Sequence, residues 1–79
     1  MSQQSSDYDL LAATVWRTPE GDPVSCREKI KVLTENLGEL RQMAQDALED
    51  AVLMGCDEAQ FRKVVGALLE GLVNPYKKG

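Results

Sequence analysis

The chain has 79 residues, a formal net charge of −4 and 43% apolar residue types. A chain of this length forms one domain at most and buries only about 60% of the surface that its unfolded form exposes, so its own core is marginal. The aliphatic content argues against wholesale disorder, and the negative charge disfavours binding to a phosphate backbone. We therefore expect a small folded protein that gains stability from a partner chain and has no nucleic-acid partner.

Ligand-forming side chains are scarce. The sequence contains no histidine and only two cysteines, Cys26 and Cys56. A structural zinc site takes four Cys or His ligands, so one chain cannot build one, and only a site shared between two chains remains formally open. The stretch "MSQQSSDYDLL" lacks the features of a signal peptide, and no segment has the roughly 20 apolar residues of a membrane span. We expect no metal, no cofactor, no membrane contact and a cytoplasmic location, where thiols stay reduced.

Residues 1–24 are predicted to form a tail and an irregular arm. Residues 2–6 are polar and terminal, which is typical of a frayed end. The stretch "DYDLLAATVWRT" fits a short helix, but the β-branched and aromatic residues at 14–16 favour extended structure, and the sequence leaves both interpretations open. The following "TPEGDP" interrupts any regular element with two prolines and a glycine.

A long helix is predicted over residues 26–54. Ser25 and Glu28 have the spacing of a capping box, so the helix is expected to begin at Cys26. Apolar residues then recur at alternating spacings of four and three, which predicts a surface for a partner helix. These heptad positions are Cys26, Ile30, Leu33, Leu37, Leu40, Ala44, Ala47, Ala51 and Met54. The first five of them form the expected dimer or partner interface.

A second, shorter helix is predicted over residues 58–73. Gly55 is placed to end the first helix in a left-handed conformation, and Asp57 is placed to cap the second, with Gln60 three residues later. The expected apolar face consists of Phe61, Val64, Val65, Leu68, Leu69 and Leu72. We expect Leu68, one of these residues, to be buried under the hairpin.

The short connection between these helices predicts an antiparallel hairpin over residues 25–79, followed by a short basic tail. At 1.5 Å per residue the helices would be about 43 Å and about 24 Å long. Basic residues (Arg27, Lys29, Lys31) begin the first helix and acidic residues (Glu35, Glu39, Asp46, Glu49, Asp50) dominate its later part. An antiparallel partner helix would place each basic end beside an acidic end. We therefore predict an all-α fold in which two hairpins dimerise into a four-helix arrangement.

The sequence offers no catalytic constellation, because it has neither a phosphate-binding glycine loop nor any histidine to pair with a cysteine. We predict a small helical protein–protein interaction or regulatory module that acts as a homodimer and is not an enzyme. One alternative is an accessory subunit of an enzyme complex that docks through its exposed heptad positions. A third hypothesis is a thiol redox sensor that uses Cys26, since the neighbouring Arg27 and Lys29 favour a reactive thiolate. Against it stands the interpretation of Cys26 as a small buried apolar residue.

Overall fold

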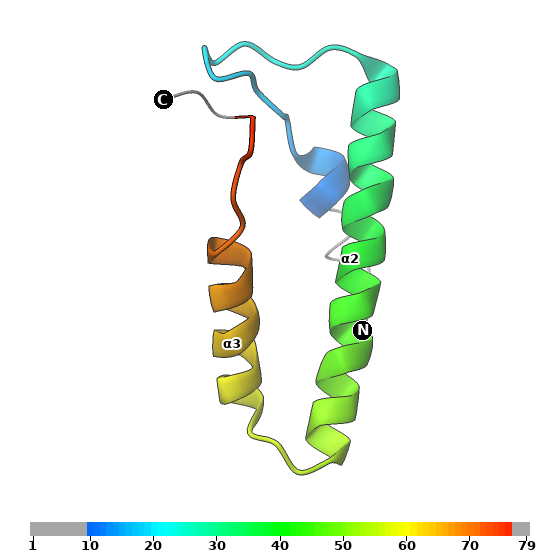
Figure 1. Cartoon of the computed structure of the whole chain (residues 1–79). Helices are drawn as coiled ribbons and strands as arrows, with labels where there is room; N and C mark the ends of the chain where they lie inside the picture. Colours follow the sequence, from blue (N-terminus) through cyan, green and yellow to red (C-terminus); the bar gives the residue numbers. More distant parts are fainter. Residues whose placement is uncertain (1–9, 77–79) are drawn as a thin grey trace. The chain divides into compact units, whose positions relative to one another are not determined.

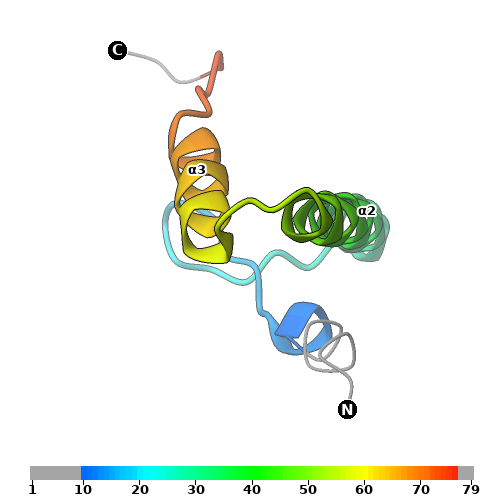
Figure 2. The ribbon, with the colours of Figure 1, turned by 90° about the horizontal axis from the view of Figure 1, so that it is seen from below.

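The computed structural model describes residues 10–76, and their regular structure is helical apart from one isolated β-bridge (Figure 1). Helix α2 spans Arg27–Leu53 and helix α3 spans Glu58–Glu70, with a further helical turn at residues 10–13 (Figure 2). This confirms the prediction of an all-α fold with a long-helix and short-helix hairpin. The chain divides into two compact units, Met1–Ala44 and Gln45–Gly79, and each is described by itself below.

The arm of the first unit folds back in a small loop over residues 16–24. The hydrogen bonds that close it run from Thr18 N–H to the Asp22 carbonyl (2.8 Å), from Gly21 N–H to the Thr18 carbonyl (2.8 Å) and from Val24 N–H to the Trp16 carbonyl (2.8 Å). Gly21 has a φ of 98°, and a left-handed residue at this place is typical of a three-residue β-hairpin loop. The stretch that the sequence marked only as a break is therefore a closed turn.

The sequence left open whether the arm is helical or extended, and the structure shows one part of it helical and another part extended. Thr14 belongs to the helical turn, because its backbone N–H and its hydroxyl both donate to the Leu10 carbonyl, at 3.1 and 2.6 Å. Three residues later Arg17 is extended and forms an antiparallel bridge with Pro23. The helical and the extended interpretation each apply to one part of the segment.

The start of α2 differs from the prediction. The Cys26 carbonyl accepts the hydrogen bond of Ile30 N–H at 3.1 Å, which makes Cys26 the flanking residue and Arg27 the first residue of the helix. Ser25 lies one position too early for a capping box, and its side chain makes no hydrogen bond within residues 10–76. The predicted Ser25 cap is therefore wrong, and the helix begins one residue later than expected.

The end of α2 is closed by backbone hydrogen bonds, as the position of Gly55 predicts. Gly55 has a φ of 92°, a conformation that glycine adopts without the steric cost of a Cβ. Its N–H donates to the Val52 carbonyl at 3.0 Å, and Cys56 N–H donates to the Ala51 carbonyl at 2.9 Å. This pair of bonds is a Schellman motif, so Cys56 occupies a structural position at the helix junction.

Helix α3 begins at the predicted cap but ends earlier than expected. The Asp57 carboxylate accepts from Gln60 N–H at 2.8 Å, which confirms Asp57 as the N-cap. The predicted end at Val73 is wrong, since the helix stops at Glu70 and Gly71 is its C-cap. Glycine has a low helix propensity, and Leu72 N–H already bonds three residues back, to Leu69 at 3.3 Å, in a tightened turn.

Very little of the described chain is buried. Among residues 10–76 only Ala51 falls in the buried class, at 8% exposure. In the second unit Leu48, Phe61 and Val65 are half-buried, whereas Leu68 is 66% exposed, so its predicted burial is wrong.

Candidate interaction surface

Residues 10–76 present neither a metal-binding cluster nor a membrane-spanning helix. No group of three or more His, Cys, Asp or Glu side chains there is arranged to hold a metal ion. None of the described helices is both long enough and apolar enough to cross a membrane. What the structure does present is apolar surface on both helices.

The five predicted interface residues divide into two groups. Cys26 and Leu40 are exposed, Leu40 to 45%. The other three, Ile30, Leu33 and Leu37, are half-buried within the chain. The structure therefore leaves only part of the predicted interface open to a partner, and the interface role of these residues stays a prediction.

A different set of residues forms the open side of α2 in the first unit. Val32 is 52% exposed and Met43 is 70% exposed, and together with Leu40 they lie at spacings that place them on one side of a helix. Asn36 is also exposed and completes the row at 32, 36, 40 and 43. We call these four residues the exposed stripe. Val32 and Met43 lie outside the heptad positions counted from Cys26 and were therefore not predicted. The sequence signal for them is the second row of apolar residues, at 32, 40 and 43.

The exposed stripe contains a hollow at its N-terminal end. The hollow has a volume of about 370 Å³ and is lined by Lys29, Val32, Leu33 and Asn36, with Glu28 beside them. The first four stand at positions i, i+3, i+4 and i+7 of one helix. Four residues at this spacing form the hole that accepts one side chain of a facing helix in knobs-into-holes packing.

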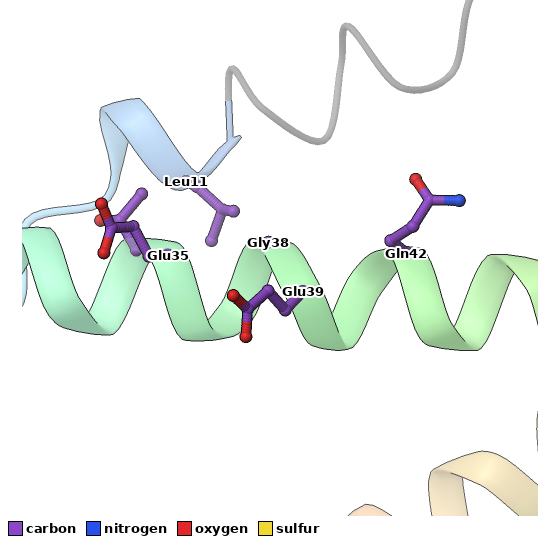
Figure 3. Close-up of a pocket in the computed structure, with 6 residues that line it drawn as sticks. Leu11, Glu35, Gly38, Glu39 and Gln42 are labelled. Atoms are coloured by element: carbon purple, nitrogen blue, oxygen red, sulfur yellow. The ribbon is translucent and has the colours of Figure 1, made fainter.

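A second hollow, of about 600 Å³, lies between the arm and α2 in the first unit (Figure 3). Leu11 projects from the arm toward the helix near Gly38, and Gln42 points away from the helix. A Cβ built on Gly38 would meet no atom within 4 Å. The arm therefore covers this side of α2 loosely. The polar rim is formed by Thr34, Glu35, Glu39 and Gln42.

The apolar face of α3 is partly open within the second unit. Val64, Leu68 and Leu69 are all exposed, and so are Leu72 and Val73 beyond the end of the helix. An ion pair between Arg62 and Glu58, with 2.9 Å between nitrogen and oxygen, lies on the exposed surface of the first turns. The second unit thus adds further apolar surface.

Both thiols are free and exposed. The interpretation of Cys26 as a buried apolar residue is wrong for the single chain, since its side chain is open to solvent at the helix start. Cys56 takes part in the α2 junction through its backbone N–H. The reactive-thiol hypothesis for Cys26 stays a prediction.

Comparison with known proteins adds no relative. No family model, no curated protein and no solved structure matches the chain.

Proposed function

We propose that the protein is a small helical interaction or regulatory module that acts as a homodimer. The observation that carries this proposal is the burial pattern, in which Ala51 alone is buried among residues 10–76. Hydrophobic burial is the main favourable term in folding, and each large aliphatic side chain contributes about 1.5–3 kcal/mol when fully buried. A chain that leaves many of its large aliphatic side chains exposed gains that contribution on association.

The charge distribution on α2 favours self-association over random aggregation. Its first residues are mainly basic, and residues 45–53 carry three acidic side chains and no basic ones. Charge patterns of this kind select partner and orientation more than they add affinity. The apolar face of α3 then remains as the surface with which a dimer would bind or regulate another protein.

The proposal is tested by measuring molar mass across a wide range of protein concentrations. Multi-angle light scattering and sedimentation equilibrium should give twice the chain mass of 8.7 kDa, falling toward one chain on dilution. Circular dichroism on the same samples should show helicity decreasing with dilution, because folding and association are linked by mass action. A monomer of constant helicity at every concentration would contradict the proposal.

A further inference from the structure

We propose that Leu40 of a second copy fills the hollow formed by Lys29, Val32, Leu33 and Asn36, with the two α2 helices antiparallel around a twofold axis at Asn36. This inference rests on the homodimer proposed above and specifies its interface. The hollow and Leu40 lie on the same side of α2. A twofold rotation that places Leu40 of the second copy in the hollow of the first therefore also places Leu40 of the first copy in the hollow of the second.

The spacing along α2 sets the axis. The hollow is centred close to Val32, and Leu40 lies eight residues further along the helix. Reversing a second helix around Asn36 places Val32 of each copy opposite Leu40 of the other. The same rotation places Lys29 opposite Met43, so Leu40 and Met43 of each copy both meet a residue that lines the hollow of the other.

Asn36 would face its own copy at the axis. Two side-chain amides that meet there satisfy each other, because each amide has both a donor and an acceptor. One polar residue in an otherwise apolar helix interface fixes the register, since sliding the helices would leave both amides buried without a partner. The exposed stripe has this arrangement, with Val32 on one side of Asn36 and Leu40 on the other.

Charge favours the antiparallel direction over the parallel one. Arg27 and Lys29 belong to the basic start of α2, and the acidic residues Asp46, Glu49 and Asp50 lie near its end. A parallel pair would bring like charges together at both ends. In the antiparallel pair Lys29, which lines the hollow, lies level with residue 43 of the second copy, about 4.5 Å along the helix from Asp46 of that copy. Exposed ion pairs of this kind contribute little stability, but they select orientation.

Disulfide trapping tests the position of the axis. The starting protein carries Cys26→Ser and Cys56→Ser, so that each added cysteine is the only one. Under mild oxidation Asn36→Cys should give a covalent dimer on a non-reducing gel, because a residue on the axis meets itself. The matched control is Glu35→Cys, at the same level of α2 but outside the stripe, where the native side chain is 60% exposed. It should stay monomeric on the gel.

Two further variants test the direction. Lys29→Cys and Met43→Cys lie about 21 Å apart along one helix, so neither should bridge to itself in the antiparallel pair. A mixture of the two single variants should give a covalent heterodimer. Self-bridging of Lys29→Cys and of Met43→Cys would indicate parallel helices and would overturn the inference.

The proposed function and this inference fail in different ways. A starting protein that light scattering shows to be monomeric would overturn both. A starting protein that is dimeric but gives no covalent dimer with Asn36→Cys would overturn the inference alone. Circular dichroism of each variant checks that the helices are retained, so that a missing crosslink is not the result of unfolding.

Discussion

At the helix junction the backbone polar groups find partners nearby in the sequence, whereas the apolar side chains in the exposed stripe of α2 remain open to solvent. At the junction, the Schellman bonds around Gly55 and the Asp57 cap all join residues within five positions of each other. The stripe has Val32, Leu40 and Met43 open to solvent. Backbone polar groups are thus satisfied locally, whereas apolar side chains need distant surface to cover them, which this short chain supplies only in part.

That contrast implies that changes to the stripe affect association and changes to the junction affect the hairpin itself. Substitutions in the two regions should therefore differ in kind as well as in size.

Leu40→Glu should abolish the dimer. The change removes an apolar contact worth about 1.5–3 kcal/mol from each of two symmetric hollows and brings a carboxylate into each, where the cost of desolvating it exceeds the attraction of the exposed Lys29 ammonium. Sedimentation equilibrium should show a monomer at concentrations where the parent is dimeric. Gln42→Glu adds the same charge on the opposite side of α2 and should leave the dimer intact. A Leu40→Glu protein that still dimerises would exclude the exposed stripe as the interface.

Gly55→Ala should destabilise the hairpin by about 1–2 kcal/mol. A Cβ is strained at a φ of 92°, although there is open space around it. Denaturant unfolding monitored by circular dichroism measures the loss. Gly66→Ala is the matched control, because Gly66 lies inside α3 with nothing within 4 Å of a built Cβ and should stabilise the helix by up to about 1 kcal/mol. Equal losses at both positions would contradict the left-handed junction.

Asp57→Ala should cost about 1 kcal/mol, and Ser25→Ala should change stability by less than about 0.5 kcal/mol. Only the Asp57 side chain holds a first-turn N–H, at 2.8 Å from Gln60. Urea midpoints of the two variants, measured side by side, compare a formed cap with an unformed one. A larger loss for Ser25→Ala would restore the capping box that the sequence predicted.

Gly38→Ala should stabilise the protein by about 0.5–1 kcal/mol, since alanine loses less backbone entropy in a helix and its methyl group meets no atom within 4 Å. Thermal unfolding at one fixed protein concentration measures the gain. The molar mass should not change, because Gly38 lies outside the exposed stripe. A destabilised variant would mean that the arm packs more tightly on α2 than the hollow beside Leu11 implies.

Features that neighbouring residues determine can be predicted from the sequence, whereas features that depend on distant surface are predicted less well. Gly55 and Asp57 were predicted at their observed places because a left-handed glycine and a carboxylate cap are determined by neighbouring residues. Ser25 and Glu28 satisfied the same kind of pattern, but the helix began one residue later and left Ser25 outside. The sequence motif by itself does not distinguish a helix that begins at Cys26 from one that begins at Arg27.

Burial was predicted less well, because periodicity gives the side of a helix and not what covers it. Leu68 lies among the apolar residues of α3 as expected, yet it is 66% exposed, because the described part of this short chain covers it only partly. The five predicted interface residues differ in exposure for a related reason. Ile30, Leu33 and Leu37 are partly covered within the chain, and Val32 and Met43, which the heptad count passed over, are open.

The small loop of the arm gives the protein a built-in optical probe. Trp16 is the single tryptophan of the chain, it is half-buried, and its carbonyl is held by Val24 N–H at 2.8 Å. Its fluorescence therefore reports on the first unit, whereas the far-ultraviolet signal of the helices arises from both. Coincident unfolding curves from the two signals would mean one cooperative transition, and an earlier change in fluorescence would mean that the arm opens while the hairpin persists.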